Sequence, residues 1–238
     1  MLAINTEEQV AIYSLGKTGT TSFLESIKDK EYWHGVGELD AQFMNDLYNI
    51  PEQGVYGWTK GYVDQLTALE MLVNDRNYKP IFIVRDPWKR YVSGIMEILQ
   101  DTFNVVMNHQ DYLRMLRDMG TETFTKQLDR LYYLSEFERQ KDFEWDMDFP
   151  YPSDFAIHYN YHVRNWLYEI EKFNDYKIVD NQDLNFFMAE YDLERQSSNV
   201  SDSVLKEMFE TCLKQTGIYF YIERYLESET ERYKKLIR

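Results

Sequence analysis

The stretch VAIYSLGKTGTTSF, residues 10–23, decides the fold. β-Branched, aromatic and apolar residues favour a strand over 9–14, and the segment 20–29 has the pattern of a helix. Apart from Lys17, the intervening GKTGTT contains only glycine and threonine. A helix N-terminus exposes unpaired backbone N–H groups and a partial positive charge, and both stabilise a bound phosphate. The stretch therefore predicts a phosphate-binding turn between a strand and a helix.

The residue types in this turn suit phosphate. Glycine lets the backbone come close, the hydroxyl side chains add donors, and Lys17 adds a mobile full charge. An ordinary strand–turn–helix capped by threonine is the alternative, but it has no need of a lysine in the turn. The expected phosphate ligands are Gly16, Lys17, Thr18, Gly19, Thr20, Thr21 and Ser22.

The nucleotide triphosphatase motif, G-x-x-x-x-G-K-[ST], is nearly present. AIYSLGKT matches it except at the first position, where Ala11 stands in place of glycine. Only Leu15 and Gly16 separate the expected strand from Lys17. Such a turn is too short to encircle a diphosphate, but it can present the lysine beside a single phosphate-like group.

Composition narrows the function classes. The chain has 238 residues and a net charge of −15, which favours one globular domain over 1–238 and argues against a broad nucleic-acid surface. Four histidines and one cysteine, without metal-ligand spacing, predict no metal site. Cys212 is expected to be a buried helix residue. Without a signal-like or membrane-spanning segment in the sequence, we expect a cytoplasmic protein with no membrane partner.

Strand-like and helix-like segments alternate along the chain, which predicts an α/β fold. The expectation is a P-loop NTPase-like three-layer fold, with a central mostly parallel sheet and helices on both faces. Segment 143–155, FEWDMDFPYPSDF, is expected to be a surface loop. It is either an ordered loop without a functional role or a loop that covers a site, where its aromatic rings would stack on an acceptor. Further strands are expected at 32–36, 54–58, 79–85 and 176–180, and further helices at 39–49, 63–77, 87–100, 108–118, 121–140, 159–173 and, as a pair, 201–236.

A second anion site is suggested by PIFIVRDPWKRYVSG, residues 80–94. Arg85 ends a buried-type strand, where its charge needs an anionic partner. Ser93 follows eight residues later on the expected helix, and the two side chains could grip a second phosphate. The alternative is an ion pair between Arg85 and a carboxylate, with Ser93 facing water.

Together these stretches resemble the sulfotransferases that use 3′-phosphoadenosine 5′-phosphosulfate (PAPS). GKTGTTSF resembles the 5′-phosphosulfate loop of that family, with Gly16 in place of its usual proline, and IVRDPWKRYVSG resembles its 3′-phosphate motif. Within the family the chain is more similar to the heparan sulfate N- and 3-O-sulfotransferase and tyrosylprotein sulfotransferase branches. WTKGYVD (58–64), the position of Glu38 and the segment 161–184 carry that likeness. The resemblance implies a P-loop-like fold, PAPS as donor, adenosine 3′,5′-diphosphate as product, and no metal.

The resemblance also implies roles for single residues. Lys17 stabilises charge on the leaving phosphate, and Lys60 steadies the sulfuryl group or the acceptor, although a solvated lysine in a turn is the simpler interpretation of Lys60. Glu38 is the first choice for the general base and His34 the second. Residues 18–22 hold the 5′-phosphosulfate, and Arg85 and Ser93 hold the 3′-phosphate.

Neither the acceptor nor the reaction class follows from the residues alone. A hydroxyl or amine of a carbohydrate or small metabolite is the expected acceptor, ahead of a peptide tyrosine. One alternative is a P-loop kinase or phosphotransferase that uses Mg²⁺, for which Asp86 is the acidic ligand on offer. A binding protein without catalysis on the same scaffold is the other.

Overall fold

The computed structural model describes residues 1–14, 18–36, 65–94, 110, 114, 117–118, 167–194 and 203–238. The chain divides into two compact units. Unit 1 comprises Met1–Arg85, Glu169–Asn199 and Ile237, and unit 2 comprises Asp86–Tyr168, Val200–Leu236 and Arg238. The expectation of a single domain over 1–238 stays a prediction.

Unit 1 contains a five-stranded sheet of order β3-β1-β2-β4-β5. β2 is parallel to β4, and β4 is parallel to β5, whereas β1 is antiparallel to both β2 and β3. Four strands therefore run in one direction and β1 runs against them, which confirms a mostly parallel sheet. The strands are β1 Leu2–Asn5, β2 Val10–Tyr13, β3 Trp33–Val36, β4 Lys79–Val84 and β5 Lys177–Asp180.

The hairpin between β1 and β2 was not predicted from the sequence. Asn5 Oδ1 accepts from the backbone N–H groups of Glu7 at 3.0 Å and Glu8 at 2.9 Å, and this side-chain cap builds the turn. Gln9, at φ 52°, completes the reversal. LAIN is a short apolar run, and such a run does not indicate by itself that it will pair with the strand beside it.

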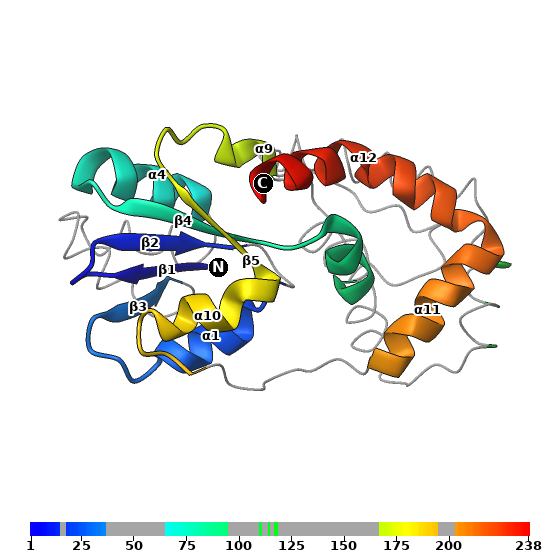
Figure 1. The fold of residues 1–238 in the computed structure, drawn as a ribbon, viewed down its shortest axis with the longest axis horizontal. Helices are drawn as coiled ribbons and strands as arrows, with labels where there is room; N and C mark the ends of the chain where they lie inside the picture. Colours follow the sequence, from blue (N-terminus) through cyan, green and yellow to red (C-terminus); the bar gives the residue numbers. More distant parts are fainter. Residues whose placement is uncertain are drawn as a thin grey trace, which may run out of the picture. The chain divides into compact units, whose positions relative to one another are not determined.

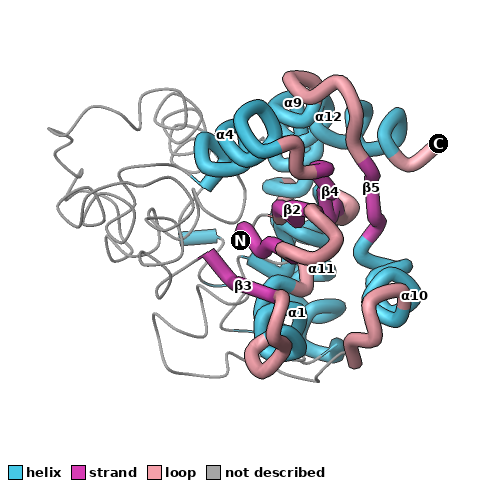
Figure 2. Tube along the Cα trace, turned by 90° about the vertical axis from the view of Figure 1, so that its left-hand side faces the viewer, coloured by secondary structure: helices cyan, strands magenta, loops and turns pink. Residues whose placement is uncertain are grey.

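Helices cover both faces of the sheet, as Figures 1 and 2 show, with α4 (Gln65–Arg76) on one face and α1 (Thr20–Ile27) and α10 (Leu184–Ala189) on the other. The alternation along β2 and β4 explains this. Val10, Ile12, Ile81 and Ile83 belong to a core cluster that also holds Phe23 of α1 and Phe187 of α10. Residues between them, such as Ala11 and Phe82, are fully buried on the other face. A sheet buried on both faces needs such continuous apolar runs.

The helices expected at 20–29 and 63–77 are present close to those positions, whereas the helix at Leu184–Ala189 was not predicted. α4 ends at Arg76 because Asn77 takes a left-handed conformation, φ 58°, and the N–H of Tyr78 then donates to Leu72 O at 3.2 Å. The predicted helix 159–173 is wrong in its extent, since residues 171–172 already form a turn. The elements of unit 1 are α1 Thr20–Ile27, α4 Gln65–Arg76, the 3₁₀ turn η1 Asn181–Asp183 and α10 Leu184–Ala189. The short helix α9 Leu167–Ile170 contains the chain's crossing from unit 2 to unit 1.

In unit 2, residues 87–94 are helical, as predicted. Asp86 caps this helix, because its Oδ1 accepts from the N–H of Lys89 at 2.9 Å while its carbonyl accepts from the N–H of Arg90 at 2.9 Å. The expected pair of C-terminal helices is confirmed as α11 Ser203–Thr216 and α12 Ile218–Leu236. Gly217, at φ 76°, separates them.

Several expected elements lie outside the described residues. These are the helices 39–49 and 121–140, the strand 54–58 and the segment 143–155. Of the expected helix 108–118, residues 110, 114, 117 and 118 are described and helical.

Candidate anion-binding site at the carboxyl edge of the sheet

The turn between β2 and α1 lies at the edge of the sheet where the parallel strands end. Gly19 is the N-cap of α1 and takes a left-handed conformation, with φ 91° and ψ 16°. Its carbonyl accepts the first helical bond, from the N–H of Phe23 at 3.0 Å. The N–H groups of the first turn have no partners within a helix, so this end of α1 suits an anion. No side chain caps it.

The hydroxyl of Thr18 points into the protein. Ser14 and Thr18 are both fully buried, and their side-chain oxygens share a hydrogen bond. Ser14 is also held to β1, because its N–H donates to Met1 O at 2.9 Å. The Thr18 hydroxyl joins the end of β2 to the start of α1 through this bond, and its expected role as a phosphate ligand stays a prediction. Among the other hydroxyls, Thr21 is exposed, Thr20 is half-buried and Ser22 is buried.

A second strand end is tied to the same turn. Asn181, the first residue after β5, donates from Nδ2 to Thr18 O at 2.7 Å across 163 positions of the chain. The side chain of Asp180 orients the turn that carries Asn181, accepting from the N–H of Gln182 at 2.9 Å. The signal in the sequence was NQDL directly after a strand, which favours an Asp-capped turn but does not say what it contacts.

Arg85 follows the last residue of β4, the strand that lies between β2 and β5. Val84 is paired with Asp180, so Arg85 and Asn181 leave neighbouring strands at the same level. Neighbouring strands are about 4.8 Å apart. The half-buried Arg85 therefore starts about one strand spacing from the residue that holds the turn before α1.

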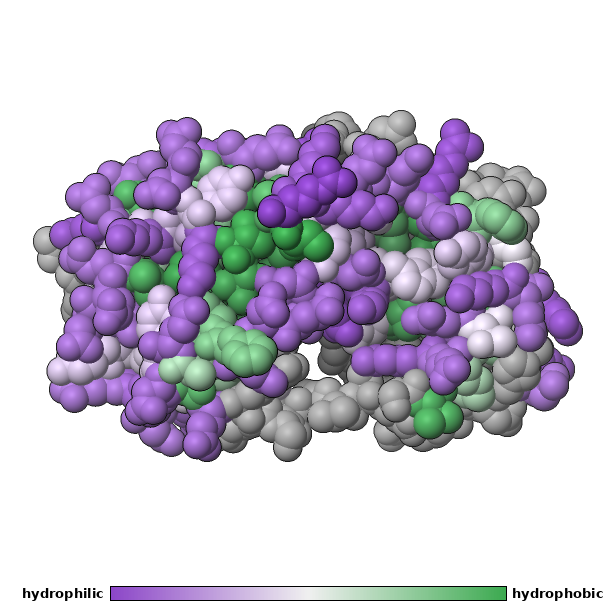
Figure 3. Space-filling model, viewed as in Figure 1, coloured by the Kyte–Doolittle hydropathy of each residue, from purple (hydrophilic) through white to green (hydrophobic). Residues whose placement is uncertain are grey.

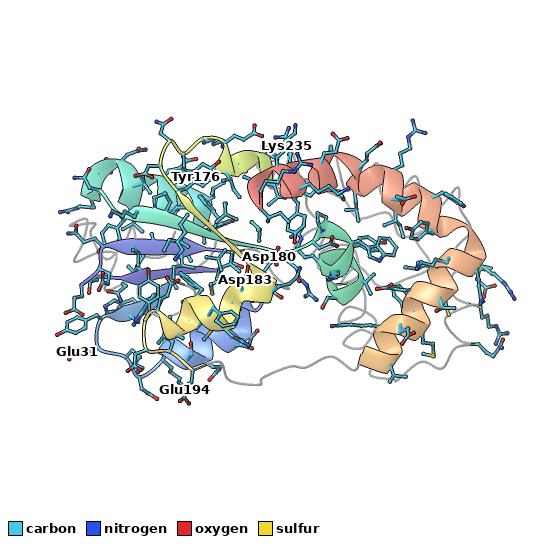
Figure 4. The ribbon with its side chains drawn as sticks, viewed as in Figure 1. Glu31, Tyr176, Asp180, Asp183, Glu194 and Lys235 are labelled. Carbon is cyan, nitrogen blue, oxygen red and sulfur yellow. The ribbon has the colours of Figure 1, made fainter. Side chains whose placement is uncertain are left out.

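Carboxylates share this edge with the arginine. Figure 4 labels Asp180 and Asp183 at the end of β5. Asp183 is exposed and Asp180 is half-buried. The ion-pair alternative for Arg85 thus has a carboxylate on the neighbouring strand, and an anion at this edge would compete with it for the guanidinium.

The structure places His34 away from the turn. His34 is paired with Ile4, and Ile4 with Ala11, which puts His34 three residues before the level of Ser14 and two strands to the side. At about 3.3 Å per residue and about 4.8 Å per strand, its backbone is on the order of 14 Å from the start of the turn. By contrast Val36, the end of β3, is on the level of Tyr13 at the same edge as the turn.

For five of the predicted site residues, the structure does not show that they lie at this site. Gly16, Lys17, Glu38 and Lys60 lie outside the described residues. Ser93 is buried and belongs to unit 2, whereas Arg85 ends unit 1. A joint 3′-phosphate site of Arg85 and Ser93 therefore stays a prediction.

Other sites are not indicated among the described residues. No group of His, Cys, Asp or Glu there could hold a metal ion. None of the described helices has the length and apolar character needed to cross a membrane. Hydrophilic side chains predominate on the face shown in Figure 3. Cys212 is buried as predicted, and burial raises the pKa of its thiol, which makes it a poor nucleophile.

Comparison of the chain with protein-family models, with curated proteins and with solved structures gave no match. The resemblance to sulfotransferases therefore rests on the motif residues of the sequence alone.

Proposed function

We propose that the protein is a PAPS-dependent sulfotransferase with a P-loop NTPase-like unit 1. The observation that carries the proposal is the meeting of two predicted anion ligands at one edge of the sheet. Gly19 opens α1 next to β2, and Arg85 leaves the neighbouring strand β4 at the same edge. A nucleotide with a phosphosulfate at one end and a phosphate at the other needs two anion sites within one molecule's reach.

The role that we propose for each residue follows from the chemistry of sulfuryl transfer. PAPS supplies the sulfuryl group, which passes to the acceptor by in-line displacement, while negative charge develops on the departing phosphate. Backbone N–H groups at the start of α1, with Thr20, Thr21 and Ser22, hold the 5′ end. Lys17 stabilises the developing charge, and Arg85 with Ser93 holds the 3′-phosphate. Lys60 steadies the sulfuryl group or the acceptor.

Glu38 remains our first choice for the general base that removes the acceptor proton. It follows Val36 by two residues, and Val36 ends β3 at the edge that carries the turn. His34 is the weaker choice, because it lies two residues before the end of the edge strand β3, farther from the turn than Val36. The proposed acceptor is a hydroxyl or amine of a carbohydrate or small metabolite.

For the kinase alternative, Asp86 would have to bind Mg²⁺ while it also caps a helix. Asp86 already accepts from the N–H of Lys89 as the cap of the helix that follows. We expect Asp86→Asn to leave nucleotide binding unchanged, because asparagine caps a helix as well as aspartate does. Loss of ATP binding in the presence of Mg²⁺ would instead favour the kinase.

Calorimetric titration tests the proposal directly. We expect the protein to bind adenosine 3′,5′-diphosphate without added metal, and to bind ATP with Mg²⁺ weakly or not at all. Arg85→Ala should weaken the bisphosphate about tenfold or more, since a charged hydrogen bond contributes about 1.5–3 kcal/mol. Lys79→Ala is the matched control, because Lys79 is an exposed cation that begins the same strand at the opposite edge.

The outcomes separate the classes. Binding of the bisphosphate that Arg85→Ala loses and Lys79→Ala keeps supports the sulfotransferase. Binding of ATP with Mg²⁺, without binding of the bisphosphate, would contradict the sulfotransferase proposal and favour a phosphotransferase. Binding of the bisphosphate without transfer of a sulfuryl group to any acceptor would favour a binding protein.

A further inference from the structure

We propose that Asn181 is a positioning residue, which selects the orientation of the Thr18–Gly19 peptide at the candidate anion site. This inference rests on the proposed function only for the identity of the ligand. Its structural basis is the 2.7 Å bond from Asn181 Nδ2 to Thr18 O.

The carbonyl that Asn181 holds belongs to the same peptide group as the N–H of Gly19. A peptide is planar and trans, so its carbonyl and its N–H point in opposite directions. Holding Thr18 O toward β5 therefore aims the N–H of Gly19 away from β5. One side-chain bond thus fixes the direction of a backbone donor at the start of α1.

This peptide has a second accessible orientation. Gly19 has φ 91°. Turning the Thr18–Gly19 peptide over would bring that φ to about −90°, which glycine adopts as readily. The residue at 19 therefore does not choose between the two orientations. The Ser14–Thr18 bond does not choose either, because it holds the side chain of Thr18 and not its carbonyl.

Asn181 is suited to make that choice. It directly follows β5, the edge strand that pairs with β4, and the side chain of Asp180 holds the turn that contains it. An amide donor satisfies the carbonyl without adding charge. A carboxylate at the same place would repel both Thr18 O and an incoming anion.

A double-mutant cycle in urea tests the choice without any ligand. Gly19→Ala should lower the unfolding midpoint, because alanine disfavours a positive φ. In the Asn181→Ala background the peptide is free to turn over, the φ at 19 becomes negative, and Gly19→Ala should lower the midpoint less. Additive effects of the two substitutions would overturn the proposal.

Titration with adenosine 3′,5′-diphosphate tests the consequence for binding. Asn181→Ala should weaken it roughly three- to tenfold, the effect of one neutral hydrogen bond, and Asn181→Asp should weaken it further. Gln182→Ala is the control: its exposed side chain lies on the same turn, and only its backbone N–H is bonded to Asp180. Wild-type-like affinity in Asn181→Ala would also overturn the proposal.

The two proposals fail separately. If the wild-type protein does not bind the bisphosphate, the sulfotransferase assignment falls, and the urea cycle still decides the role of Asn181. If the wild-type protein binds and both Asn181 variants bind equally well, the positioning role falls and the assignment stands.

Discussion

At the scale of single residues, two buried hydroxyls hold the turn that the proposed function uses. Ser14 and Thr18 are fully buried and hydrogen-bonded to each other. A buried polar group is stabilised by its partner and is costly when that partner is removed. The pair therefore acts as a unit, one member on the strand end and one just before the helix.

We predict that the two substitutions at this pair are not additive. Thr18→Val should lower the unfolding free energy by about 1–3 kcal/mol, because it leaves Ser14 without this partner. Adding Ser14→Ala should cost less than the sum of the single changes, since both polar groups are then gone. Urea denaturation of the two single variants and the double variant measures the coupling. Strict additivity would mean that the hydroxyls do not depend on each other.

At the scale of the element, α10 shows how one short helix divides between core and solvent. Phe187 is 3% exposed and belongs to the core cluster, whereas its neighbour Phe186 is 78% exposed. Phe187 packs edge-on against Tyr191, with ring centroids 5.2 Å apart. Successive residues of a helix point in different directions, so the sequence FF alone does not say which ring is buried.

These adjacent phenylalanines form a matched pair for experiment. We expect Phe187→Ala to lower the unfolding free energy by about 3–5 kcal/mol, the usual effect of removing a large buried side chain. Phe186→Ala should change it by less than about 0.5 kcal/mol. Thermal or urea unfolding of the two variants checks the difference. Equal losses would show that α10 presents a different face to the sheet.

At the scale of the whole molecule, the buried phenol of Tyr78 and the half-buried phenol of Tyr191 predict how the free energy of unfolding depends on pH. Burial raises the pKa of the Tyr78 hydroxyl, although Arg76 lowers it in part, and burial followed by Glu190 and Glu8 raises the pKa of Tyr191. The folded state therefore holds these protons more tightly than the unfolded chain does. This contribution is complete below the ordinary tyrosine pKa of 10.0 and is lost as the pH rises through the higher folded values.

Unfolding free energy should accordingly fall above pH about 10. In Tyr78→Phe the fall should be shallower, because one of the linked protons is absent. Urea denaturation over a series of alkaline pH values measures the slope, and tyrosinate absorbance reports the titration itself. Parallel profiles for the variant and the wild type would contradict a raised pKa at Tyr78.

Unit 1 is assembled from distant parts of the chain, which limits what local patterns can reveal. The run KPIFIV indicates a buried strand, and Asp86-Pro87 indicates a helix start, because hydrophobic period and capping chemistry are local. β5 comes from residues nearly a hundred positions later and completes the sheet beside β4. Its place there is set by packing on both faces, which no local pattern encodes.

The amino-acid sequence by itself determined the α/β class, the strand–turn–helix with Gly19, the start of the helix after Asp86, the two C-terminal helices and the burial of Cys212. Only the tertiary structure decided that β1 runs against its neighbours, that the Thr18 hydroxyl turns inward and that Asn181 holds Thr18 O. Periodicity and capping act over a few residues, whereas these three features depend on sheet order and register. Sheet order and register depend on how the apolar surface of the whole chain is buried, which no local pattern specifies.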